Sequence, residues 1–153
     1  MKQNWGIFMI SMMMLTIING CSETKAKINM NGEKNIGECS DRLNCVSSQN
    51  KNGRHAVKPF RLKGTPAKSW NNIANFVANM PRTNIVDASD NYLHAECKSR
   101  LFGFIDDLEL QLDPSTGFIA IRSASRIGHY DFGVNRRRVE KLRQTLQEKG
   151  LIY

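Results

Sequence analysis

The sequence has few of the residues from which most metal-binding and catalytic motifs are built. Its 153 residues include only four cysteines, three histidines and two tryptophans. The cysteines form no CxxC pair and the histidines no HxxxH pair, so the usual spacing of zinc ligands is missing. A GxSxG nucleophile elbow and a phosphate-binding glycine loop are also missing. These absences argue against zinc, serine-hydrolase and nucleotide sites, and we expect neither a metal nor a cofactor.

One long apolar run is present, from Trp5 to Ile18, and Lys2 is the only charged residue before it. The run is shorter than the roughly 20 residues of a membrane-spanning helix and is typical of a secretory signal. It ends at Gly20-Cys21, which resembles the lipobox of bacterial lipoproteins. We therefore expect residues 1–20 to be a signal peptide and Cys21 to be acylated. An ordinary signal peptide cut nearby is the alternative.

The rest of the chain divides into two parts. Residues 21–37 are rich in Lys, Asn, Ser and Glu, which predicts a flexible, lipid-anchored tether. Residues 38–153 have the length of a single globular domain. The whole is predicted to be an exported lipoprotein of the bacterial cell envelope that faces the periplasm and is held to the membrane through Cys21.

Acidic residues are fewer than basic ones, 14 against 22, and the formal net charge is +8 at pH 7. An exported protein does not meet nucleic acid, so we expect no nucleic-acid partner. It does meet anionic lipid headgroups and other envelope anions. The charge therefore favours an anionic small molecule, a lipid headgroup or an envelope protein as partner. The alternative is that the excess charge only keeps the surface solvated.

Hydrophobic periodicity predicts an α+β fold with an antiparallel four-stranded meander sheet. The strands are predicted at residues 83–88, 92–99, 105–112 and 118–127. Thr65-Pro66 begins a predicted helix that Pro81 ends. A last helix is predicted from Arg136 to about Lys149, with Asn135 as its N-cap. Both helices are expected on one face of the sheet, beside a loop-rich N-terminal cap at 38–63.

Alternation within the strands separates an apolar face from a charged face. In the third strand the leucines face one side, while Asp107 and Glu109 face the other. If these leucines and the isoleucines of the fourth strand lie on the same face of the sheet, Arg122 of the fourth strand lies opposite Glu109 or Asp107 of the third. Polar residues of the second strand join the charged face, namely Tyr92, His94, Glu96 and Lys98. Ordinary salt bridging on a wet surface is the alternative to a functional face.

Three cysteines, Cys39, Cys45 and Cys97, remain if Cys21 is acylated. In an oxidising compartment two of them should form a disulfide, and three pairings exist. Cys39 and Cys45 enclose a short loop, so we expect them to pair. Cys97 lies in the apolar alternation of its strand, which predicts a buried free thiol.

Three arginines, Arg136 to Arg138, begin the last helix, where the macrodipole disfavours each cation by about 0.3–1 kcal/mol. The guanidinium group of arginine forms paired hydrogen bonds with carboxylates and phosphates, so the cluster favours an anionic ligand. Gly128 and Gly133 bracket a turn that we expect to shape a pocket between the last strand and the helix. A fixed network of arginines and acids is the alternative. The predicted ligand-binding set is Arg122, Arg126, Arg136, Arg138, Asp106, Asp107, Glu109 and Asp131.

Three stretches carry a family resemblance: the cysteine-bracketed Cys39–Ser48, the acidic Tyr92–Asp113 and the arginine-rich Ile121–Arg143. Together they resemble the bacterial and plastid family called domain of unknown function 1499. The resemblance implies an exported or membrane-associated domain and brings no activity, substrate or cofactor. By motif match it singles out Asp106, Asp107, Glu109, Arg122, Ser123, Ser125, Arg126, Gly128, Asp131, Gly133, Asn135, Arg136 and Arg138.

The combined features favour a non-catalytic binding or structural module with an Arg/Asp-rich site. A hydrolase-like enzyme is one alternative, in which the carboxylates Asp106, Asp107 and Glu109 work with His94 or His129. Neighbouring residues of a strand point to opposite faces, which argues against a carboxylate pair of Asp106 with Asp107. An envelope scaffold that binds another protein through the charged face is a further alternative.

Overall fold

The computed structural model describes residues 27–28, 34–51 and 53–153. The predicted signal peptide at 1–20, the predicted acylation site Cys21 and most of the predicted tether lie outside these ranges. Within them, no helix is long and apolar enough to span a membrane. The elements are β1 (Lys27–Ile28), β2 (Lys34–Asn35), β3 (Cys45–Ser47), β4 (Phe60–Arg61), α1 (Pro66–Ala78), β5 (Thr83–Ala88), β6 (Tyr92–Lys98), β7 (Ile105–Leu112), β8 (Phe118–Ser125) and α2 (Val134–Glu148).

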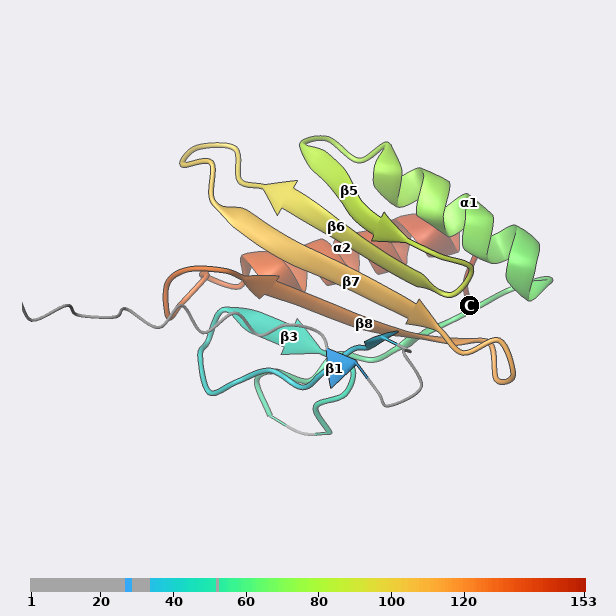
Figure 1. The fold of residues 1–153 in the computed structure, drawn as a ribbon, viewed down its shortest axis with the longest axis horizontal. Coiled ribbons are helices and arrows are strands. Elements are labelled where there is room, and N and C mark those ends of the chain that lie inside the picture. The colour runs from blue at the N-terminus through green and yellow to red at the C-terminus, as the bar shows by residue number, and fades with distance from the viewer. Residues whose placement is uncertain (1–26, 29–33, 52) are drawn as a thin grey trace, which may run out of the picture.

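An antiparallel sheet and two helices make up most of the described chain, so the predicted α+β class is confirmed (Figure 1). The long strands β5 to β8 neighbour one another in chain order because short turns connect them. The sheet has six strands rather than four, since β3 and β4 both pair with the free edge of β8. A strand of three residues is too short to show alternation, which is why the sequence did not predict β3.

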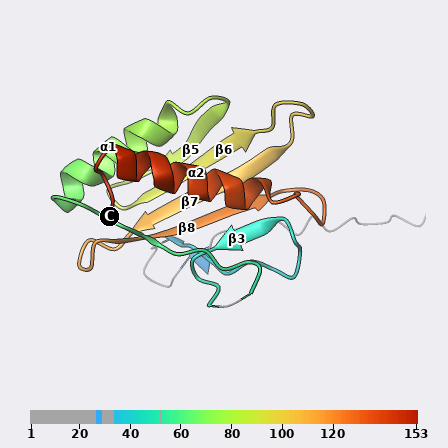
Figure 2. The same ribbon diagram turned by 180° about the vertical axis from the view of Figure 1, so that it is seen from behind.

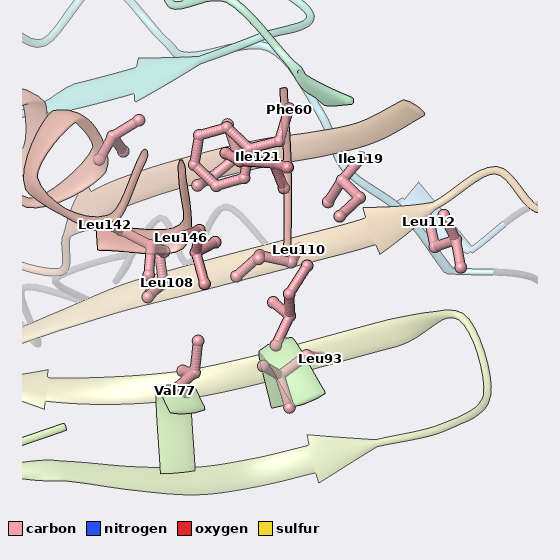
Figure 3. Packing of buried hydrophobic residues seen from close by; sticks show 14 of the residues in the cluster. Phe60, Val77, Leu93, Leu108, Leu110, Leu112, Ile119, Ile121, Leu142 and Leu146 are labelled. Carbon is pink, nitrogen blue, oxygen red and sulfur yellow. The ribbon is translucent and has the colours of Figure 1, made fainter. Parts of the chain in front are cut away.

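Both helices lie across the same face of the sheet, as Figure 2 shows from behind. Their apolar sides and the inward side chains of the strands form one buried cluster (Figure 3). Its fully buried members include Ile73, Val77, Leu93, Leu108, Leu110, Ile119, Ile121, Val139 and Leu146. Each buried side chain of this kind contributes about 1.5–3 kcal/mol, so this layer is a major source of stability.

The start of α2 differs from the prediction. The helix begins at Val134, and Gly133 takes the N-cap position with a φ of 74°. The carboxylate of Asp131 accepts hydrogen bonds from the backbone N–H of Gly133 and of Asn135, both at 2.8 Å. Asp131 therefore caps the helix from outside, and Asn135 is buried within the first turn instead of acting as the N-cap.

The Cys39–Cys45 disulfide is present and Cys97 is a buried free thiol, as predicted. Burial raises the pKa of the Cys97 thiol, which therefore remains protonated in the core. Packing against the domain begins before residue 38. The backbone N–H of Ile36 donates to Gln111 Oε1 at 3.1 Å, and the Ile36 side chain is buried. The last part of the predicted tether, from Lys34, thus contacts the sheet.

Candidate functional site

The eight predicted ligand-binding residues lie in three places. Four are on the sheet face away from the helices, here called the polar face: Asp107, Glu109, Arg122 and Arg126. Asp106 and Arg138 lie between the sheet and α2. Arg136 and Asp131 lie at the N-terminus of α2. The separation follows from strand geometry, because Asp106 and Asp107 point to opposite faces and cannot form a carboxylate pair.

A buried ion pair forms the centre of the polar face. Glu109 and Arg122 are cross-strand partners, as predicted, and Arg122 Nη1 donates to Glu109 Oε2 at 2.7 Å. The hydroxyl of Tyr92 donates to Glu109 Oε1 at 2.8 Å. Burial and then the charge of Glu109 raise the pKa of Tyr92, so its hydroxyl keeps the proton that it donates. These groups are shielded from water, with exposed fractions of 4% for Glu109 and 6% for Arg122.

Asp107 contacts two charged or titratable side chains at the rim of the polar face. Arg126 donates to its two oxygens at 3.0 and 2.8 Å, and His94 Nε2 lies 2.7 Å from Oδ1. Arg126 also donates to Glu96 at 2.6 Å. Burial would raise the pKa of Asp107, but the hydrogen bonds from His94 and Arg126 outweigh burial and lower the pKa to about 2. A carboxyl with so low a pKa is a poor general acid or base near neutral pH.

The low pKa of Asp107 predicts acid-sensitive stability. Its folded pKa of about 2 lies below the usual value of 3.8, so the stabilisation is complete above the usual value and is lost as the pH falls through about 2. We expect Asp107→Asn to show a smaller loss of unfolding free energy than wild type over this interval. Urea denaturation at stepped pH measures the difference, with the exposed Asp90→Asn as control. Identical profiles for Asp107→Asn and wild type would contradict the prediction.

Arg138 and Asp106 belong to a buried polar network on the helix side of the sheet. Arg138 Nη2 donates to Asp106 Oδ2 at 2.5 Å. Its Nη1 donates to Ser123 Oγ at 2.9 Å and to Asn135 Oδ1 at 2.5 Å. Asp106 is 3% exposed, and Ser123 and Asn135 are fully buried. The network joins α2 to β7 and β8. It is a fixed network of an arginine and an acid, the alternative to a ligand-binding role for these residues.

Asn44 extends this network, and sequence reasoning missed it. The backbone carbonyl of Asn44 accepts a hydrogen bond from Asn135 Nδ2 at 2.9 Å. The Asn44 side chain donates to the carbonyls of Ser125, Ile127 and Gly128 at 3.3, 3.3 and 2.7 Å. It therefore ties the segment before β3 to the end of β8. The only signal in the sequence was its place inside the family-like stretch Cys39–Ser48.

A pocket of about 300 Å³ lies at the N-terminus of α2. The turn between Gly128 and Gly133 forms one wall through Tyr130 and Asp131, as expected from the two glycines, but none of the lining residues comes from the last strand, β8. The opposite wall comes from β3 and the loop after it, which includes His55, because β3 extends the sheet past β8. Two arginines, Arg54 and Arg136, line the same pocket.

Neither pocket arginine forms an ion pair with a described residue. Arg136 Nη2 donates to the neutral backbone carbonyls of Arg54 and Ala56, at 2.6 and 3.0 Å. The arginine ion pairs of the described chain instead involve Arg122, Arg126, Arg138 and Arg143. Asp131 also lines the pocket and keeps its negative charge, but its single carboxylate is outnumbered by the two guanidinium groups. The pocket therefore carries positive charge.

A metal site is not formed by the described residues, which include no cluster of three or more His, Cys, Asp or Glu side chains.

Comparison with protein families agrees with the motifs in the sequence. A family described as Protein of unknown function (DUF1499) matches residues 35–146. The chain belongs to this family. The DUF1499 match contains the polar face, the network beneath α2 and the pocket. No curated protein and no solved structure matches the chain.

Proposed function

We propose that this chain is an exported, lipid-anchored envelope protein whose domain binds a small anion in the pocket at the N-terminus of α2. The meeting of two arginines in one pocket carries the proposal. Four arginines are neutralised by carboxylates, whereas Arg54 and Arg136 line a pocket without an ion pair among the described residues. Guanidinium groups recognise carboxylates and phosphates. The volume of about 300 Å³ is at the small end of ligand sites.

The guanidinium groups, rather than helix amides, would make the main contacts with the anion. An open helix N-terminus offers its backbone N–H groups to a phosphate. In α2 the carboxylate of Asp131 already accepts two of these hydrogen bonds. Arg136 is held in place by two backbone carbonyls, so little side-chain entropy is lost when it binds.

A non-catalytic role is supported by the state of the acids. Asp106 and Glu109 are each buried in an ion pair with an arginine. Asp107 is held ionised by Arg126 and His94, with a pKa of about 2. None of these three carboxyl groups faces the pocket. The three carboxylates that a hydrolase would use are therefore paired with basic side chains that stabilise the fold.

Anion binding is tested by replacing the pocket arginines. We expect Arg136→Gln to weaken the binding of inorganic phosphate or citrate roughly tenfold to hundredfold, because a hydrogen bond to a charged group contributes about 1.5–3 kcal/mol. Arg54→Gln should act in the same direction. Isothermal titration calorimetry on the full chain measures both. Arg137→Gln is the matched control, since it removes the same charge from an exposed neighbouring position. Equal affinity of the Arg136 and Arg137 variants would refute the site.

The lipid anchor has its own test. We expect radiolabelled palmitate to enter the wild-type chain and not Cys21→Ala. The label can be assigned to Cys21 because the other cysteines are either paired, as Cys39 with Cys45, or buried, as Cys97. Equal labelling of wild type and variant would exclude the lipoprotein proposal and leave an ordinary signal peptide.

A further inference from the structure

We propose that two loops at one end of the domain dock onto a bilayer surface that carries anionic lipid headgroups. The loops are residues 99–104, between β6 and β7, and residues 126–133, between β8 and α2; together they are called the loop tip. The second loop also forms a wall of the anion pocket through Tyr130 and Asp131, but the exposed rings of Phe102 and Phe132 do not line that pocket, and the inference goes beyond the function proposed above.

The loop tip concentrates exposed apolar side chains. Six of the ten large hydrophobic residues that are exposed in the described chain belong to it: Leu101, Phe102, Phe104, Ile127, Tyr130 and Phe132. Three of them are strongly exposed, with 81% for Leu101, 70% for Phe102 and 76% for Phe132. Scattered apolar residues are normal on a protein surface, but a grouped set marks a contact with a membrane or a partner.

The two loops lie at the same end of the sheet. β6 ends, β7 begins and β8 ends at that edge, and both views show the connecting loops there (Figures 1 and 2). The backbone N–H of Arg126 donates to the carbonyl of Ile105 at 3.3 Å, which holds the second loop beside the base of the first. Tyr153 and the start of β8 lie at the opposite end. The domain thus exposes six large apolar side chains at this end, against the rings of Phe118 and Tyr153 at the other.

Each loop presents a pair of aromatic rings. The ring centroids of Phe102 and Phe104 are 5.6 Å apart, and those of Tyr130 and Phe132 are 4.8 Å apart. Phe132 has a φ of 54°, a left-handed conformation that is rare for a bulky side chain. Its exposure shows that core packing does not require a phenylalanine there. A strained position that keeps an exposed aromatic ring points to a contact made by the ring.

The charge of the loop tip matches an anionic surface. Its apolar residues are accompanied by exposed cations: Lys98 before the first loop, Arg100 within it and Arg137 after the second. Asp131 is the one acid within these loops, so the three exposed cations outnumber it. Aromatic rings flanked by Lys and Arg suit the headgroup region of an anionic bilayer. An apolar surface that binds another protein would not need exposed cations around it.

Tryptophan fluorescence tests whether the loop tip enters the bilayer. The full chain, with Trp5→Phe to remove a tryptophan in the N-terminal apolar run, is reconstituted in vesicles of phosphatidylglycerol and brominated phosphatidylcholine. Phe102→Trp and Phe132→Trp report on the tip, and Phe118→Trp and Tyr153→Trp are controls at the opposite end. We expect blue-shifted, bromine-quenched emission from the two tip variants and not from the controls. The buried Trp70 gives the same background in each variant.

The outcomes separate the bilayer from other partners. Equal quenching at both ends, or none at the tip, overturns the proposal. Protection of the tip tryptophans from aqueous iodide in native membranes without bromolipid quenching overturns it in favour of a protein partner. Lys98→Glu combined with Arg100→Glu should lose most of the tip quenching. Unchanged quenching in that variant removes the role of headgroup charge. Arg136→Gln should leave tip quenching intact, so this result and that of the anion titration are independent.

Discussion

Replacing Arg138 by alanine is expected to lower the free energy of unfolding by about 3–5 kcal/mol, the cost of removing one partner from a buried ion pair. Asp106 is 3% exposed, and Arg138 Nη2 is its charged partner at 2.5 Å. Without the guanidinium, the carboxylate remains in the interior with its charge uncompensated. Ser123 and Asn135 also lose a donor to their buried oxygens. Urea denaturation with an unchanged m-value measures the loss.

Arg137→Ala is the matched control for this experiment. Arg137 precedes Arg138 on the same helix and is exposed, so its loss should change stability by no more than about 0.5 kcal/mol. A double variant, Asp106→Leu with Arg138→Met, should recover part of the stability because no unpaired charge is buried. Equal stability of the Arg137 and Arg138 variants would show that the network contributes nothing beyond surface charge.

The conflict between three arginines and the helix dipole is resolved by three different partners. Successive helical residues point about 100° apart, so the three arginines cannot all face one partner. Arg136 donates to the carbonyls of Arg54 and Ala56, Arg137 to that of Phe132, and Arg138 to Asp106. Asp131 adds negative charge at the same helix end. The identities of these partners depend on tertiary contacts that no helical pattern contains.

The faces of the sheet could be predicted because strand alternation leaves little choice of register. Leu110 pairs with Ile121 and Glu109 with Arg122, the arrangement that keeps one face dry. The alternation also placed Asp106 and Asp107 on opposite sides. It did not reveal that Glu109 and Arg122 are buried, since burial of the polar face depends on the residues that cover it.

The elements that the sequence missed are those without a repeating pattern. Cys45–Ser47 is a three-residue strand whose partner, β8, lies far along the chain. Asn135 looked like an N-cap because asparagine is common there, but a cap from Asp131 requires the left-handed turn at Gly133. The predicted Arg/Asp set combines residues that lie on different faces and at different ends of the sheet, a placement that only the folded arrangement determines.

Glu109→Gln is expected to cost about 3–5 kcal/mol, although it preserves the size and shape of the side chain. The loss arises from Arg122, which is 6% exposed and has Glu109 as its ion-pair partner. Arg122 Nε is buried without a hydrogen-bond partner among the described residues, so no second contact compensates there. Tyr92 would then donate to a neutral amide, a weaker acceptor than the carboxylate.

Glu140→Gln provides the comparison, because it removes the same charge from a different ion pair. The Glu140 side chain is 48% exposed and pairs with Arg143 at 2.9 Å, so its replacement should cost no more than about 1 kcal/mol. Chemical denaturation of both variants at neutral pH gives the two losses directly. If Glu109→Gln proves as mild as Glu140→Gln, water must reach Arg122 and the polar face is solvated after all. A large loss for Glu109→Gln alone would establish the buried pair as a structural centre of the domain.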